Sequence, residues 1–138
     1  MTTRRLATIF CVALLALVGC RDRSTDQDKQ DKLCAQLGEL DGVVARLAAV
    51  DSGAPDAVAQ LRSLRSQLEA EYRDVQEAAR DADNTRMDAV TQAYNKVVRS
   101  VSGVNDQATL AQAEPAIDEA AGEFSTARLE LHTQARCA

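Results

Sequence analysis

From residue 32 onward, apolar residues recur at alternating intervals of three and four, which places them on one face of an α-helix. The first such stretch ends at Asp51-Ser52-Gly53, and Pro55 suits an early position of the following helix. Two successive helices are therefore predicted. Their apolar positions are Leu33, Leu37, Leu40, Val44 and Leu47 in the first, and Val58, Leu61, Leu64, Leu68, Tyr72, Val75 and Ala79 in the second.

The pattern is interrupted over Asp81–Thr85, where a turn is predicted. Thr85 with Asp88 resembles a capping box for a third helix, with Asp in place of the usual Glu. Because no Gly or Pro occurs in this stretch, the alternative is a single helix of about 50 residues, about 70 Å long. Neighbouring helices would cover only half of it, so we expect the turn. The third helix has apolar positions Met87, Val90, Tyr94, Val97 and Val101.

A fourth helix follows Ser102-Gly103, with Asn105 or Asp106 as its cap. Pro115 would break or kink a continuous helix, so we expect a short turn near 107–113 and a main helix over 115–135. The apolar positions of this helix are Ile117, Ala120, Phe124, Ala127 and Leu131. The four segments together predict an all-α fold, an up-down antiparallel bundle that occupies residues 32–138 as one domain.

The first 31 residues have a different pattern. Arg4 and Arg5 precede an uncharged apolar run over 6–18, which matches a secretory signal and is shorter than the roughly 20 residues of a transmembrane helix. Residues 21–31 contain no aliphatic or aromatic side chain, so a disordered polar tether is expected. The chain therefore predicts an exported domain on a tether.

The end of the apolar run, Leu17-Val18-Gly19-Cys20, resembles the lipobox of bacterial lipoproteins at all four positions. This resemblance implies that residues 1–19 are removed as a signal peptide and that Cys20 carries a diacylglycerol thioether. It further implies a protein anchored to the extracytoplasmic face of the cell membrane or outer membrane, with Cys20 at the start of the tether (residues 20–31). Two or more acyl chains make such anchoring stable.

Of the four cysteines, Cys11 leaves with the signal and Cys20 is acylated in this interpretation, so Cys34 and Cys137 remain. An even pair in an exported protein favours a disulfide, with two free thiols or an intermolecular bridge as the alternatives. Up-down helices bring the two cysteines to one end only when the helix number is even, which supports four helices. Gly38 and Gly42 follow Cys34 at four-residue intervals, which indicates a ridge of small residues for close helix approach or for dimerisation.

The segment from Cys34 to Cys137 is also similar to small cysteine-framed, alanine-rich helical secreted proteins of high-GC bacteria. This resemblance rests on pattern and composition and implies no activity. Loss of residues 1–19 removes two of 16 basic residues and none of 21 acidic ones, leaving a formal charge of −7. Such a charge argues against nucleic acid as a partner, and acyl chains rather than a basic patch must hold the protein at the membrane.

The sequence contains few residues that could form a catalytic, cofactor or metal site. His132 is the only histidine, and its neighbours Glu130 and Cys137 do not complete a recognised motif, so packing or surface exposure is expected. The sequence lacks the Glu-x-x-His pairs of di-iron bundles, the haem motif C-x-x-C-H and clustered zinc ligands. No catalytic, cofactor or metal site is therefore predicted. The acidic run along the second helix is expected to be a solvated face with ion pairs such as Glu69–Arg73.

These features favour a non-enzymatic, lipid-anchored envelope protein that acts as a spacer or protein-interaction module, with an unidentified envelope protein as its partner. The alternative is an extracytoplasmic binding module for a small apolar ligand or peptide. Tyr72 and Tyr94 lie on the apolar faces of their helices, so we interpret them as core residues rather than ligand-stacking residues. The oligomeric state stays open.

Overall fold

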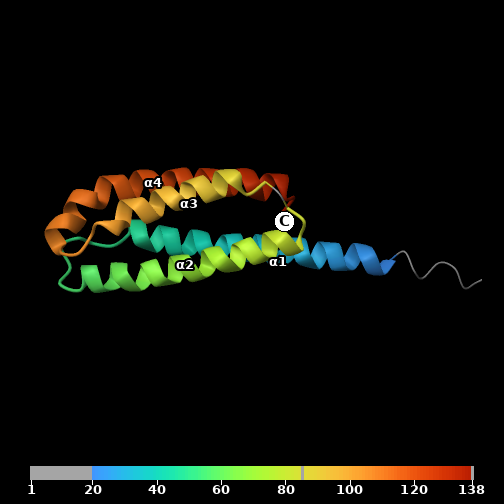
Figure 1. Cartoon of the computed structure of the whole chain (residues 1–138), viewed down its shortest axis with the longest axis horizontal. Helices are drawn as coiled ribbons and strands as arrows, with labels where there is room; N and C mark the ends of the chain where they lie inside the picture. The colour runs from blue at the N-terminus through green and yellow to red at the C-terminus, as the bar shows by residue number, and fades with distance from the viewer. Residues whose placement is uncertain (1–19, 85, 138) are drawn as a thin grey trace, which may run out of the picture.

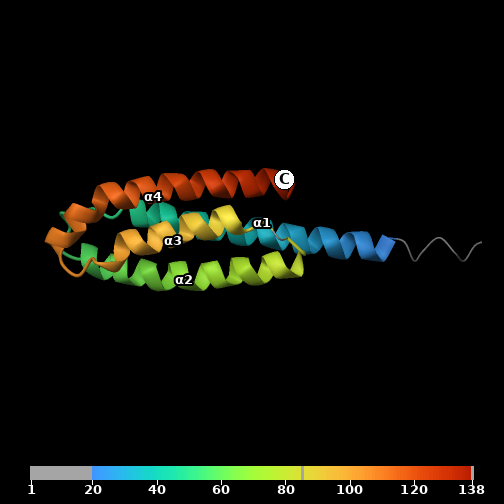
Figure 2. The same ribbon diagram turned by 45° about the horizontal axis from the view of Figure 1, so that its top comes forward.

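Four α-helices make up most of the chain that the computed structural model describes, residues 20–84 and 86–137, with side chains described from residue 25. The predicted signal peptide lies outside the described residues. The helices form two antiparallel hairpins that lie against each other (Figure 1), and Figure 2 shows the same pairs from a second side. The predicted up-down four-helix bundle is confirmed. The helices are α1 (Cys20–Ala48), α2 (Ala57–Asp81), α3 (Asp88–Ser102) and α4 (Gln107–Gln134).

One apolar core joins all four helices. The predicted apolar stripes supply it, and Phe124 of α4 is fully buried within it. Tyr72 is buried and stacks on half-buried Tyr94, with ring centroids 3.6 Å apart and planes 7° from parallel. Burial, aided by the charge of Glu69, raises the pKa of Tyr94 above its ordinary value. Both tyrosines therefore belong to the packing between α2 and α3, as predicted.

The turn between α2 and α3 is present where the pattern predicts it. The amide of Asn84 donates to the carbonyl of Ala79 across 2.8 Å, and that of Asp83 donates to Arg80 across 3.1 Å. Asp83 takes a left-handed backbone conformation with φ 50°. These features define a Schellman cap, which satisfies the last carbonyls of α2 and reverses the chain. A single long helix is therefore excluded.

The caps of α3 and α4 differ from each other. α3 begins at Asp88 behind Met87, which makes no capping bond through its side chain, and Thr85 lies outside the described residues. Asp106 does cap α4, because its carboxylate accepts the Thr109 amide at 2.8 Å while the Thr109 hydroxyl accepts the Asp106 amide at 3.1 Å. The predicted Asp106 cap is confirmed, and the reciprocal partner is Thr109.

The predicted turn before Pro115 is wrong, because α4 is one continuous helix from Gln107 to Gln134. Pro115 has no N–H for the carbonyl of Ala111, but both residues are exposed, so water can hydrate that carbonyl. Leu110 and Ile117, on either side of the proline, are both buried in the core. Their burial holds the two parts of the helix in line.

The disordered tether predicted for residues 20–31 is also absent, because these residues form the first turns of α1. Once the apolar part of α1 is helical, each further residue adds a hydrogen bond without a new nucleation cost. Gln27 donates to Asp31 at 2.9 Å, and Lys29 lies 3.8 Å from Asp26, both at helix-neighbour spacing. Figure 1 shows this segment projecting beyond the bundle as a helical stalk.

Candidate functional site

Three parts of the chain meet where α1 leaves the bundle, and we call this region the anchor end. They are the stalk of α1 (residues 20–31), the α2–α3 turn and the last turn of α4 (Figure 2). Cys20, the residue expected to carry lipid, is the first residue that the structure describes and is part of α1. No helix among the described residues has the length and apolarity needed to cross a bilayer.

A disulfide closes the anchor end. Cys34 and Cys137 are bonded with their Cα atoms 5.7 Å apart, across a sequence separation of 103. The intramolecular pairing is therefore confirmed, and free thiols at these positions are excluded. In the usual entropy model a loop of this length raises the free energy of unfolding by about 4–5 kcal/mol.

A second Schellman cap positions Cys137 for this bond. Arg136 is left-handed with φ 53°, and the amide of Cys137 donates to the carbonyl of His132 across 3.0 Å. The chain therefore turns away from the axis of α4 immediately after Ala135, toward α1. Cys34 is half-buried on the side of α1 that this turn reaches, as its bond to Cys137 shows.

Two polar contacts fasten the stalk to its neighbours. The side-chain amide of Gln30 donates to the carbonyl of Ala135 at 2.8 Å, and Lys32 lies 3.6 Å from Asp81. The first contact ties α1 to the end of α4, and the second ties it to the end of α2. Neither was predicted, because hydrophobic periodicity carries no information on contacts 105 residues apart.

Polar side chains also join α1 to α4 nearer the middle of the bundle. Asp41 accepts the Ser125 hydroxyl at 3.1 Å and forms an ion pair with Arg128, whose Nε lies 3.3 Å away. That nitrogen is buried and makes no hydrogen bond, so its contact with Asp41 is ionic. The Arg128 and Asp41 side chains are 20% and 27% exposed, which shields the pair partly from solvent.

The predicted glycine ridge does not mediate close packing within the chain. Gly38 and Gly42 are exposed, and a Cβ atom added at either position would meet nothing within 4 Å. The close approach of α4 is achieved instead at Cys34, Asp41 and the core positions of α1. Helix approach through these glycines within the bundle was therefore a wrong prediction.

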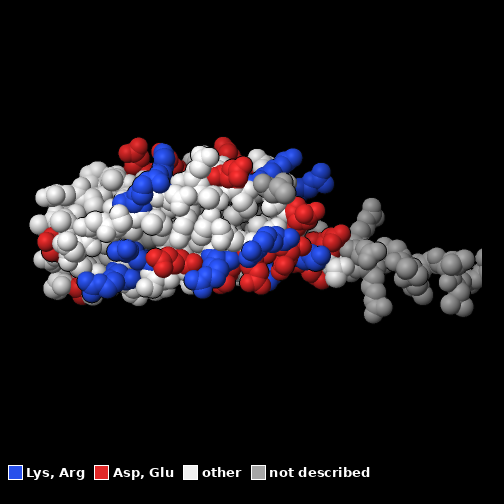
Figure 3. All heavy atoms as spheres, viewed as in Figure 1, with Lys and Arg blue, Asp and Glu red and all other residues white. Residues whose placement is uncertain are grey.

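The charged face of α2 is solvated, as predicted, and appears as alternating red and blue along the lower edge of Figure 3. The ion pairs expected within it do not form at 4 Å among the described side chains, since Asp81 pairs with Lys32 of α1 and Glu69 has no such partner. Exposed side chains of this kind gain little from pairing in water.

The described side chains that could act in catalysis or metal binding do not form a common site. His132 is half-buried, Glu130 is exposed, and Cys137 is committed to the disulfide. Among residues 20–84 and 86–137, no cluster of three or more His, Cys, Asp or Glu side chains is suited to a metal ion. An open groove of about 410 Å³ lies between α1 and α2, with Val50 and Leu64 among polar side chains in its lining.

No protein-family model, curated protein or solved structure matches the chain.

Proposed function

We propose that the protein is a lipid-anchored component of the bacterial cell envelope whose helical bundle serves as a non-enzymatic spacer or protein-interaction module. One observation carries the proposal: Cys20, which completes the lipobox-like stretch, lies in the same continuous helix that enters the bundle. An acyl anchor on Cys20 would therefore connect to the folded domain through a helix rather than through a flexible chain.

The length of the helical stalk would set the distance between the bundle and the membrane. Residues 20–31 would rise about 18 Å along the helix axis at 1.5 Å per residue. Gln30 within the last turn of that stalk, and Lys32 and Cys34 just beyond it, fix α1 to α4 and α2. A rigid stalk held at its base would keep the bundle at a defined distance from the bilayer surface, with its anchor end toward the membrane.

Cys20→Ala tests the anchoring. In a bacterial host that processes lipoproteins, the variant should move from the membrane fraction to the soluble exported fraction. Cys11→Ala is the matched control, because that cysteine lies in the segment expected to be removed, and its membrane association should be unchanged. A Cys20→Ala chain that is processed and still sediments with membranes would refute the proposal.

An unidentified envelope protein is the proposed partner of the bundle. Crosslinking in intact cells, followed by capture of the anchored protein from solubilised membranes, should recover one partner in a fixed ratio. The Cys20→Ala chain supplies the control, since its partner should fall away when the bundle is no longer held at the membrane. If no protein is recovered in a fixed ratio, the interaction function is refuted and only the spacer function remains.

The α1–α2 groove favours a second candidate, a module that binds a small apolar ligand or peptide. Its volume of about 410 Å³ falls within the range of ligand pockets, although polar side chains share the lining with Val50 and Leu64. Native mass spectrometry of the protein extracted from membranes tests this function. A retained apolar molecule, displaced when Leu64 is changed to Gln, would support it, and a ligand-free mass would oppose it.

A further inference from the structure

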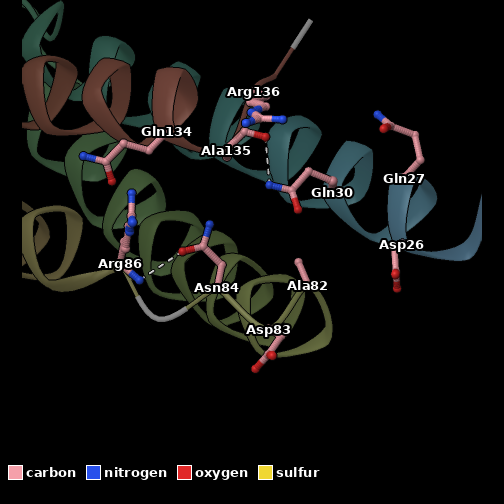
Figure 4. A pocket seen from close by; sticks show the side chains of 10 residues that line it. All are labelled: Asp26, Gln27, Gln30, Ala82, Asp83, Asn84, Arg86, Gln134, Ala135 and Arg136. Carbon is pink, nitrogen blue, oxygen red and sulfur yellow. Dashed lines mark hydrogen bonds between the residues drawn. The ribbon is translucent and has the colours of Figure 1, made fainter. Parts of the chain in front are cut away.

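A polar cleft of about 650 Å³ lies at the anchor end, between the stalk of α1, the α2–α3 turn and the end of α4. Figure 4 shows Arg86 and Arg136 on different walls of this cleft, with the side-chain amide of Asn84 beside Arg86, that of Gln30 bonded to the Ala135 carbonyl near Arg136, and that of Gln134 on the far side of Arg86. These residues come from three separate segments of the chain. The cleft therefore exists only because the bundle brings those segments together.

Backbone strain is concentrated at the cleft. Among the described residues other than glycine, Asp83 and Arg136 alone have positive φ, at 50° and 53°, and both line it. Aspartate tolerates this conformation, whereas for arginine it is uncommon and unfavourable. Strained backbone positions cluster at ligand-binding sites, where the surrounding structure holds them in place. At Arg136 the Cys34–Cys137 disulfide supplies that restraint.

The two arginines are available to a ligand. Neither guanidinium forms an ion pair with any side chain of the described residues, and both are exposed. Asn84 uses its Oδ1 to accept the Arg86 amide at 3.0 Å, so its Nδ2 remains free to donate into the cleft (Figure 4). The guanidinium groups of Arg86 and Arg136 and the Nδ2 group of Asn84 therefore border the same cleft.

Groups that would repel an anion are occupied or turned away. The carbonyls of Ala79, Arg80, His132 and Thr133 accept backbone amides in the two Schellman caps, and Ala135 accepts the Gln30 side chain. The carboxylates of Asp26 and Asp83 also line the cleft, but they lie at its outer edge, away from Arg86 and Arg136 (Figure 4). The C-terminal ends of α2 and α4 still contribute partial negative charge beside the cleft, so the attraction of an anion rests on the guanidinium groups of Arg86 and Arg136.

We propose that the cleft binds the phosphate group of a small polar ligand, with Arg86 and Arg136 as its charged contacts. Guanidinium groups match phosphate oxygens with paired N–H donors, and the side-chain amides suit hydroxyl groups next to the phosphate. The volume accommodates a molecule the size of a glycerol phosphate or a phospholipid headgroup. The formal charge of −7 on residues 20–138 opposes anions in general, so binding depends on these two arginines.

Isothermal titration of the full-length, anchored chain in neutral detergent tests the proposal with two soluble probes. They are sn-glycerol 3-phosphate, a monoester, and glycerophosphoglycerol, the diester headgroup of phosphatidylglycerol. Saturable one-to-one binding of either probe is expected. Tighter binding of the monoester assigns the site to a free phosphate ligand, and tighter binding of the diester assigns it to a lipid headgroup.

The double variant Arg86→Gln/Arg136→Gln should weaken binding by at least about tenfold, the loss typical of removing hydrogen bonds to a charged group. Arg86→Gln alone, in an exposed turn, should show part of that loss even if the double variant is unstable. Arg62→Gln, an exposed arginine of α2 remote from the cleft, is the matched control and should bind as the unmodified protein does. Absent saturation with both probes, or an equal loss in Arg62→Gln, would overturn the proposal.

Discussion

Cys137 donates its backbone amide to the carbonyl of His132 across 3.0 Å, and this bond turns the end of the chain toward Cys34. The turn is what allows the two Cα atoms to approach to 5.7 Å. A local helix cap and a long-range covalent bond therefore depend on the same few residues. The anchor end is closed by both.

Removal of the disulfide should cost a large part of the stability. For the double variant Cys34→Ser/Cys137→Ser, we expect the free energy of unfolding to fall by about 4 kcal/mol, because the unfolded chain regains the freedom of a long loop. Urea unfolding followed by circular dichroism measures the change. The unmodified protein kept under reducing conditions is the control and should match the variant, while equal stability of variant and oxidised protein would contradict the account.

Asp83→Gly should stabilise the α2–α3 turn. Glycine adopts the left-handed conformation of residue 83 without a Cβ penalty, and the expected gain is about 0.5–1 kcal/mol. Ala82→Gly is the matched control at φ −82°, where glycine offers no such relief and should destabilise by a similar amount. Thermal unfolding distinguishes the two, and a loss of stability in both variants would count against the Schellman cap.

The Tyr72 hydroxyl donates to the Thr91 hydroxyl at 2.8 Å, and this bond should join α2 to α3 measurably. Tyr72→Phe and Thr91→Val should each lower the free energy of unfolding by about 1 kcal/mol. In the double variant the losses should not add, because both substitutions remove the same hydrogen bond. Strict additivity in the double-mutant cycle would show that the contact contributes nothing.

The Asp106 cap should make α4 sensitive to acid. The backbone amide of Thr109, which donates to Asp106, holds the pKa of that carboxyl below its ordinary value of 3.8. A lowered folded-state pKa means that the stabilisation is complete above pH 4 or so and is lost as the pH falls through the lowered value. Asp106→Ala should therefore lower Tm by a few degrees at neutral pH, and the difference should narrow in acid.

Asp106→Asn is the control for that titration. Its side-chain oxygen still accepts the Thr109 amide but does not ionise, so it should lose less stability than Asp106→Ala at neutral pH. A Tm difference between the unmodified protein and Asp106→Ala that stays constant from neutral to acidic pH would show that the carboxylate charge is not involved.

Hydrophobic periodicity predicted most of this fold because each helix buries a single stripe, as Leu33 to Leu47 do in α1. The Asp81–Thr85 turn was predictable for the same reason, and the paired cysteines fixed the even number of helices. The expectation that Pro115 would break the helix was wrong, because burial of Leu110 and Ile117 on either side outweighs one missing hydrogen bond.

The anchor end was less predictable. Composition correctly marks residues 21–31 as polar, but it does not report that a neighbouring buried helix can extend through them. The contacts of Gln30 and Asp41 with α4 involve polar residues far apart in sequence, and no local pattern encodes them. The cleft residue Arg136 acquires its position from the Schellman cap, which the sequence lacks a glycine to signal.

We propose above that a lipid on Cys20 anchors the disulfide-closed bundle. Intact mass analysis of the protein extracted from bacterial membranes, without reduction, tests it most directly. We expect a chain that begins at Cys20, carries the added mass of a diacylglycerol with or without an N-acyl group, and lacks two hydrogens for the Cys34–Cys137 bond. A mature chain that begins elsewhere, or that carries no lipid on Cys20, would contradict it.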